Sequence, residues 1–204
     1  MKKIILIIVI ISSISCKSQT IIPTFSSQER IRDEHHYLKD IDNDFNKFNG
    51  IWKYTNGNTS LTLSLNKEEK KQVLNKGMYK DFLVGEYQYI ENGIEKVNTL
   101  NLINNTAFIN YDHNIVGFVI IDNWGKPRCD TCNPNDRRIR AIIKHPTDKN
   151  TTHTITLRYI NTNRVEKIEL KIYGSSADVI LLAEGEPDPL DLPVPMGTYI
   201  LTKQ

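Results

Sequence analysis

The chain has 204 residues, of which 39% are hydrophobic and 25% are charged, values typical of one folded domain and not of a disordered chain. The formal net charge of +2 comes from Lys2 and Lys3, which lie in a segment that we expect to be cleaved; without them 24 basic residues face 24 acidic ones. A neutral mature chain lacks the basic surface of nucleic-acid-binding proteins, so we expect no nucleic acid among its partners.

The first fifteen residues have the pattern of a signal peptide. Two lysines precede an unbroken apolar run from Ile4 to Ile11, and small residues follow up to Ser15. The run is far shorter than the roughly 20 residues that a membrane-spanning helix needs. We therefore expect residues 1–15 to be a signal peptide that is removed from the mature protein.

The end of this leader, Ser13-Ile14-Ser15-Cys16, resembles the lipobox of bacterial lipoproteins, although the usual pattern has Leu where this chain has Ser13. The resemblance implies that Cys16 becomes the first residue and carries palmitate and other acyl chains. Each buried methylene contributes about 0.8 kcal/mol, so several chains would hold the protein in the membrane, which we expect to be the outer membrane of the cell envelope. The alternative is an ordinary secretory signal in which Cys16 carries no lipid.

The segment after the lipobox is polar. We expect residues 16–33 to form the lipidated N-terminus and a flexible tether, and residues 34–204 to form a single domain. Apolar residues spaced among charges, including Tyr37, Phe45 and Phe48, predict a short helical segment just before Gly50.

From Gly50 onward the pattern is that of β-strands. Leu61, Leu63 and Leu65 alternate with polar residues, as in a strand with one buried face. Two Asn-Gly pairs, Asn56-Gly57 and Asn92-Gly93, separate such runs and predict hairpins, because both residues tolerate positive φ. Further strands are expected at 94–103, 106–111, 115–122, 138–144, 152–160, 164–173, 178–183 and 196–203, and residues 67–76 are the one plausible helical insert.

About ten strands with turn signals every 8–15 residues indicate an all-β fold. We expect an antiparallel barrel of about 8–10 strands, with a β-sandwich as the alternative. The sequence has no Gly-x-Ser-x-Gly, His-Glu-x-x-His or Gly-x-x-x-x-Gly-Lys motif. We therefore expect a binding protein without catalytic residues, cofactor or metal. An envelope hydrolase, with a cleft that holds paired acids or a metal, is a further hypothesis.

Several short motifs run through most of the mature chain, namely Tyr37-Leu38-Lys39-Asp40, Phe48-Asn49-Gly50-Ile51-Trp52-Lys53-Tyr54, Leu83-Val84-Gly85-Glu86-Tyr87-Gln88-Tyr89 and Met196-Gly197-Thr198-Tyr199-Ile200-Leu201. Together with the leader they resemble the DUF6705 family of uncharacterised flavobacterial lipoproteins. The family has no assigned activity, so the resemblance implies a lipoprotein and transfers no catalytic residue to this chain.

Gly50-x-Trp52 also resembles the motif at the start of the first strand of lipocalins. This resemblance implies that Trp52 closes one end of an eight-stranded barrel, with Arg158 or Lys203 stacked on its ring.

A barrel of this size can hold one small ligand in its interior. We hypothesise that the ligand is apolar or amphipathic and that aromatic residues line or plug the interior: Trp52, Tyr54, Tyr87, Tyr89 and Trp124. The simpler interpretation of Trp52 is core packing. The alternative function is a protein-interaction module, such as a subunit of an envelope assembly, an inhibitor or an immunity protein.

Cys129 and Cys132 form a Cys-x-x-Cys pair in a loop rich in turn residues. The oxidising cell envelope favours a disulfide between them. A redox-active pair would need a lowered thiolate pKa, usually from a helix N-terminus, and no helical pattern follows Cys132. A zinc site would need two further ligands. We favour the structural disulfide, and the other two interpretations stay open.

Overall fold

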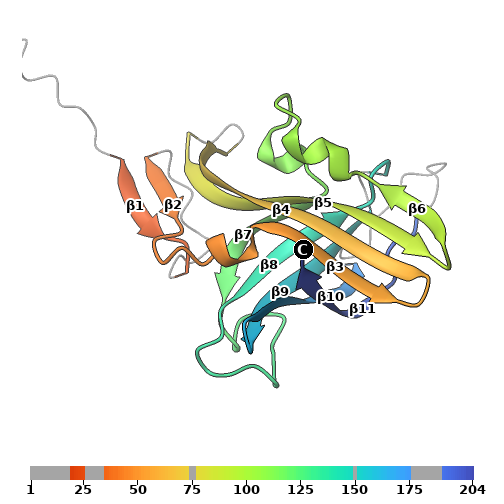
Figure 1. Ribbon diagram of the computed structural model, residues 1–204. Helices are drawn as coiled ribbons and strands as arrows, with labels where there is room; N and C mark the ends of the chain where they lie inside the picture. The colour runs from red at the N-terminus through yellow and green to blue at the C-terminus, as the bar shows by residue number, and fades with distance from the viewer. Residues whose placement is uncertain (1–18, 26–34, 74–76, 149–150, 176–189) are drawn as a thin grey trace, which may run out of the picture.

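A computed structural model describes residues 19–25, 35–73, 77–148, 151–175 and 190–204, and it shows a closed antiparallel barrel (Figure 1). Eight strands form the ring: β3 (Gly50–Asn56), β4 (Thr59–Gln72), β5 (Tyr79–Glu91), β7 (Ile115–Ile121), β8 (Arg138–Lys144), β9 (Thr152–Thr162), β10 (Val165–Ser175) and β11 (Gly197–Lys203). Each ring strand pairs with the next ring strand along the chain, and β11 returns to β3. The predicted all-β barrel is confirmed, and the sandwich is not the fold.

Three short strands extend the sheet outside the ring. β6 (Ile94–Asn98) continues the hairpin that follows β5, while β1 (Thr20–Pro23) and β2 (His36–Lys39) add in parallel beside the start of β5. β1 lies within the segment predicted to be a tether. It forms there because the β-branched residues Ile21 and Ile22 pair with Tyr37 and Leu38.

The period-two pattern of the strands explains the core. Leu61, Leu63 and Leu65 of β4 face inward opposite Tyr89, Tyr87 and Gly85 of β5. The bulky leucine at the last pair is matched by a residue with no side chain. A Cβ atom placed on Gly85 would lie 2.5 Å from Cδ2 of Leu65, so the interior is packed to contact at this level.

One end of the barrel is closed by residues before β3. The short 3₁₀-helix η1 (Asn46–Phe48) is the helical segment expected just before Gly50. Phe45 and Phe48 are fully buried, and the indole Nε1 of Trp52 donates to the Phe48 carbonyl at 2.7 Å. In the described part of the chain, no helix is long and apolar enough to cross a membrane.

The opposite end is covered by residues 190–196, which precede β11. Leu192 and Val194 belong to the barrel core. Asp148 accepts a hydrogen bond from the backbone N–H of Leu190 at 2.9 Å, and the Tyr199 hydroxyl donates to the Pro195 carbonyl at 2.7 Å. The expected strand at 178–183 lies outside the described residues.

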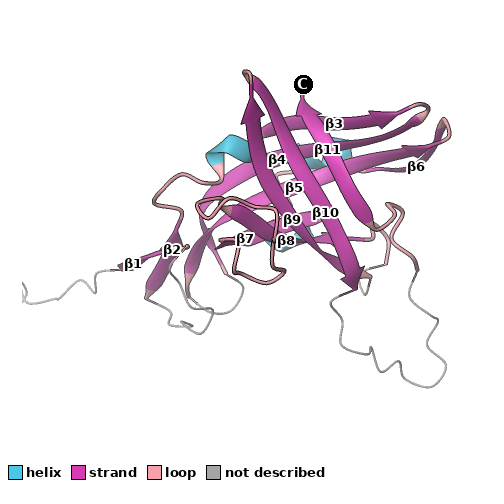
Figure 2. Cartoon of the chain, turned by 90° about the horizontal axis from the view of Figure 1, so that it is seen from below, coloured by secondary structure: helices cyan, strands magenta, loops and turns pink. Residues whose placement is uncertain are grey.

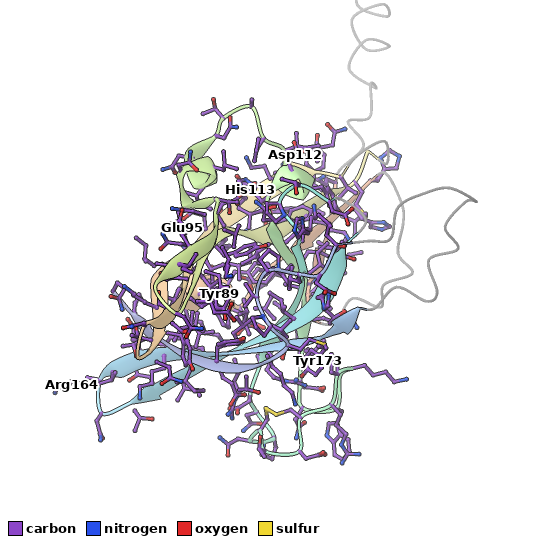
Figure 3. The ribbon with its side chains drawn as sticks, turned by 90° about the vertical axis from the view of Figure 1, so that its right-hand side faces the viewer. Tyr89, Glu95, Asp112, His113, Arg164 and Tyr173 are labelled. Carbon is purple, nitrogen blue, oxygen red and sulfur yellow. A yellow bond between two sulfur atoms is a disulfide. The ribbon has the colours of Figure 1, made fainter. Side chains whose placement is uncertain are left out.

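The segment between β6 and β7 covers the outer face of the barrel over β4 and β5 and contains η2 (Leu100–Asn104) and η3 (Asn110–Asp112). Glu86 is fully buried beneath it and is bonded to His113 Nδ1 at 2.9 Å and Asn114 Nδ2 at 2.6 Å (His113 is labelled in Figure 3). The strand predicted at 106–111 was wrong. Asn105 and Asp112 instead accept backbone N–H groups of this segment, which competes with strand pairing.

The structure also differs from the sequence-based expectation at residues 67–76 and at the first hairpin. The helical insert expected at 67–76 was wrong through Gln72, because β4 continues beside β5 with a bulge between Glu68 and Lys71. The first hairpin turns at Gly57-Asn58, one residue later than predicted, since Asn56 pairs with Thr59. The second turns at Asn92-Gly93 as predicted, with positive φ at both residues.

Candidate functional site

Side chains of the described residues form a packed core in the barrel interior. Trp52 and Tyr87 have no exposed surface and Tyr89 has 4%, while Tyr54 is half-buried against the same core. A side chain with no exposed surface has no water-sized space beside it, so a ligand between these residues would require the core to move apart. Of the five aromatic residues that we expected to line or plug the interior, Trp52, Tyr87 and Tyr89 belong to the core and Tyr54 packs against it.

Trp124, the fifth of these residues, lies elsewhere. It belongs to the loop 122–137 between β7 and β8, here called the disulfide loop, and 69% of its surface is exposed. Cys129 and Cys132 are joined by a disulfide in this loop. The Arg128 guanidinium lies 4.8 Å from the centroid of the Trp124 ring. Figure 2 shows the loop crossing the outside of the barrel in front of β8 and β9.

A pocket of about 240 Å³ lies between the disulfide loop and the barrel wall. The loop contributes Arg128, Cys129 and Asp130, and the wall contributes Arg138, Lys171 and Tyr173. The wall residues face outward because strand side chains alternate and their neighbours Ile139, Leu170 and Ile172 point into the core. Tyr173 and the disulfide lie on the same side of the barrel (Figure 3). We call this pocket the wall pocket.

Arg138 is the unusual residue of the wall pocket, since only 2% of its surface is exposed. Its Nη2 donates to the carbonyl oxygens of Asp122 at 2.7 Å and Gly125 at 3.3 Å, whereas its Nε has no hydrogen-bond partner. Across the described ranges, no carboxylate lies within 4.0 Å of its guanidinium. Burial, together with the nearby charge of Arg158, lowers the pKa of Arg138. A buried cation with neutral partners alone is costly.

The acidic residues of the wall pocket are committed to other cations. Arg158 lies directly opposite Arg138 on β9, and it binds both oxygens of Glu169, at 3.1 and 2.9 Å. This hydrogen bonding raises the pKa of Arg158 despite its burial. Asp130 pairs with Arg128 at 2.9 Å. Arg138 therefore keeps a positive charge that the wall pocket does not neutralise, and Lys171 beside it adds a second.

A larger pocket of about 480 Å³ near η1 has a different electrostatic character. Arg137 binds Asp42 at 2.5 Å and Asp44 at 2.7 Å, and Lys47 binds Asp44 at 2.9 Å. Both cations of this pocket are thus paired with carboxylates, so neither is a buried charge that a ligand would neutralise. The wall pocket is the stronger candidate site.

The chemistry of the wall pocket is that of anion binding. Three cationic residues line it, of which Arg128 is paired with Asp130 and Arg138 and Lys171 are not paired with a carboxylate that lines the pocket. Its cysteine sulfur is bonded to another sulfur, so the pocket offers no thiolate. Within the ranges that the structure describes, no group of three His, Cys, Asp or Glu side chains is placed to hold a metal ion. Cys16 lies outside those ranges.

Sequence reasoning missed Arg138. A charged residue at an outward position of a strand is usually solvated, and Arg137-Arg138-Ile139-Arg140 gives no sign of which arginine is buried. Burial arises because the disulfide loop folds back over the strand that follows it, and this contact is tertiary.

No curated protein and no solved structure gives a significant match to the chain. The DUF6705 family, described as a family of unknown function, matches residues 1–204, the whole of the sequence. Together with the barrel described above, this match shows that the chain belongs to the DUF6705 family.

Proposed function

We propose that this protein is a lipid-anchored binding protein of the bacterial cell envelope, and that it binds a small anionic ligand in the wall pocket. The observation that carries the proposal is the burial of Arg138 without a carboxylate partner. A ligand carboxylate or phosphate in the pocket would supply the missing negative charge. The ion pair between this ligand group and Arg138 would be partly shielded from solvent, where the attraction between opposite charges is stronger than in water.

The envelope location is supported by two independent features. The leader and Cys16 have the pattern of a lipoprotein signal, and the Cys129–Cys132 disulfide suits an oxidising compartment. The test of lipidation is metabolic labelling with a palmitate analogue. Label that is present on the native protein and lost in Cys16→Ser supports the anchor, and equal labelling of both proteins overturns it.

The ligand proposal is tested by thermal unfolding of the purified protein in phosphate and in chloride at equal ionic strength. We expect phosphate to raise the melting temperature in a saturable way, since a ligand at 100 times its dissociation constant adds about 2.7 kcal/mol. Arg138→Met keeps the aliphatic length and removes the buried charge, so it should abolish the phosphate effect. Because it also removes the donor to the Asp122 and Gly125 carbonyls, its melting temperature in phosphate is compared with its own value in chloride.

Two further variants keep this test decisive. Lys171→Met alters an exposed residue of the wall pocket and should weaken the phosphate effect without affecting folding. Lys53→Met removes an exposed cation from β3, outside the pocket, and should leave the effect intact. A phosphate effect that is absent from the native protein, or equal in native protein, Arg138→Met and Lys171→Met, would contradict the proposal.

A protein-interaction module is the second candidate function. The exposure of Trp124 favours it, because an aromatic side chain with 69% of its surface in solvent is a common anchor at interfaces. Crosslinking in intact cells through a photoreactive residue at position 124 tests it. A discrete crosslinked protein supports this candidate function, and the absence of any crosslinked protein opposes it.

A further inference from the structure

A second, smaller pocket adjoins the wall pocket. It has a volume of about 90 Å³ and shares Arg128, Cys129 and Asp130 with the wall pocket. Its other lining residues are Asn123 and Trp124. One ligand that passes over Arg128 can therefore contact both pockets, and we call the smaller one the Asn123 pocket.

Asn123, which lines this pocket, also carries a polar atom without a partner. The side-chain oxygen Oδ1 of Asn123 is buried and accepts no hydrogen bond. An unpaired buried acceptor costs about 1–3 kcal/mol, and a hydroxyl or N–H donor removes that cost. Asn123 follows Asp122, whose carbonyl holds Arg138. The disulfide loop thus contributes one unpaired acceptor, and Arg138 contributes one unpaired donor, its Nε.

The barrel wall adds hydroxyl groups to the wall pocket. Thr156, Tyr173 and Thr198 all line it, and the Thr156 and Tyr173 hydroxyl oxygens lie 3.3 Å apart. Hydroxyls can both donate and accept hydrogen bonds, so this wall suits a ligand that carries hydroxyls of its own.

Trp124 provides an apolar face beside these polar groups. Arg128 stacks against its ring at 4.8 Å, yet 69% of the residue stays exposed, so most of its surface is open to a flat partner. Taken together, the volumes of about 240 and 90 Å³ reach only the lower end of the range of roughly 300–1,000 Å³ seen for drug-sized ligands. The ligand should therefore be about the size of a single sugar ring.

We infer that the ligand is an anionic monosaccharide, a hydroxylated ring with one acidic group. The acidic group faces Arg138 and Lys171, a ring hydroxyl donates to Asn123, and the C–H face of the ring lies against Trp124. This inference rests on the proposed function, because it names the ligand class of the same site.

Binding of such a ligand involves movement of the disulfide loop. Asn123 Oδ1 and Arg138 Nε are both shielded from solvent, so the loop has to shift outward for ligand atoms to reach them. The disulfide restrains the turn between Cys129 and Cys132 and leaves the segment around Asn123 without a covalent restraint. Hydrogen exchange of the loop amides should therefore change on binding, while exchange in the barrel core stays constant.

The experiment is isothermal titration of the full chain with glucuronate, glucose 1-phosphate, glucose, acetate and inorganic phosphate. We expect both anionic sugars to bind at least about tenfold more tightly than acetate or phosphate, since each added contact is worth a few-fold to tenfold in affinity. Glucose should bind most weakly. The order of the two anionic sugars identifies the acidic group as carboxylate or phosphate.

Two variants test the named contacts. Trp124→Ala removes an exposed side chain and should lower the affinity for the anionic sugars but not for phosphate. Asn123→Ala removes an acceptor that makes no hydrogen bond in the protein, and it should act in the same way. The matched control is Ile94→Ala, an exposed residue on β6, which should change neither affinity.

The outcomes separate this inference from the proposed function. Phosphate and acetate binding that depends on Arg138, without a gain for the anionic sugars, overturns the sugar inference and leaves the anion site standing. Absence of binding by every anion overturns both. Glucose that binds as tightly as glucuronate overturns the assigned role of the acidic group.

Discussion

The Nζ atom of Lys203 lies 5.3 Å from the centroid of the Trp52 ring, so the last strand of the barrel and the first are joined by a cation–π contact. The two residues are also backbone partners at the point where the ring closes. Of the two cations considered from sequence, Lys203 therefore covers Trp52, whereas Arg158 points outward to Glu169. Lys203 is held in place by Glu166 at 2.8 Å.

The coupling energy between Trp52 and Lys203 can be measured by a double-mutant cycle. Trp52→Ala should lower the free energy of unfolding by about 3–5 kcal/mol, as for large buried aromatics. Lys203→Met should cost about 0.5–1 kcal/mol, the usual value of a partly exposed cation–π contact. Urea denaturation of both single variants and the double variant gives the coupling energy. Strict additivity would show that the two side chains do not stabilise each other.

Gly85→Ala tests how tightly the interior is packed. The added Cβ would lie 2.5 Å from Leu65 Cδ2 and 2.9 Å from the Ser64 carbonyl oxygen. We expect a loss of about 1–3 kcal/mol in the free energy of unfolding, because an overpacked core must shift. Gly174→Ala is the control, since its Cβ would meet only Met196 Sδ, at 3.6 Å. A neutral Gly85→Ala would show that the interior has room at this level and would favour the interior-ligand hypothesis.

Asp81 anchors the N-terminal strands to the barrel, so we predict that Asp81→Ala loosens β2. Its carboxylate accepts hydrogen bonds from the Tyr37 hydroxyl at 2.6 Å, the Asp40 N–H at 2.9 Å and the Lys70 N–H at 2.8 Å. Hydrogen bonds to a buried charge contribute about 1.5–3 kcal/mol each. Hydrogen exchange of residues 36–40 should accelerate more than exchange in β9. Glu95→Gln, at an exposed site on β6, should change neither rate, and a uniform change across the barrel in Asp81→Ala would refute a local anchor.

The folded state should lose stability at alkaline pH because of the ionisation of Tyr199. Burial, reinforced by the nearby Tyr89, Tyr54 and Glu91, raises its pKa from 10.0 to about 12. The folded state thus holds the hydroxyl proton more strongly than the unfolded state does. The resulting contribution to stability is complete below pH 10 and is lost as the pH rises to 12.

The measurement is the urea midpoint as a function of pH for the native protein and for Tyr199→Phe. The variant cannot ionise at this position, so its midpoint should fall less steeply between pH 10 and 12. Parallel curves for the two proteins would mean that Tyr199 ionises alike in the folded and unfolded states.

Local sequence patterns predicted much of the fold. The alternation of Leu61, Leu63 and Leu65 predicted an inward face that the structure confirms, and Asn92-Gly93 predicted the turn that is found. These features depend on the two-residue period of a strand and on the tolerance of Asn and Gly for positive φ, which neighbouring residues alone determine. The position of a short helical element before Gly50 also follows from its local sequence.

The wrong predictions have two causes, which are long-range strand pairing and local hydrogen bonds between side chains and the backbone. Residues 67–72 carry the charge pattern of an exposed helix, but β5 lies beside them and Asp81 accepts the N–H of Lys70 at the bulge. The segment around Asn105 and Asp112 loses its expected strand because its backbone bonds to nearby side chains instead.

The sequence by itself determined most strands of the ring, the first hairpin to within one residue, the second hairpin, and the inward face of leucine and isoleucine residues. Whether those strands closed into a barrel or split into two sheets was decided by the pairing of β11 with β3, between residues about 150 positions apart, which no local period encodes. The candidate site was decided in the same way. In the sequence, Arg138 does not differ from the neighbouring arginines. The disulfide loop buries its side chain and supplies backbone carbonyls, not a carboxylate, as its hydrogen-bond partners.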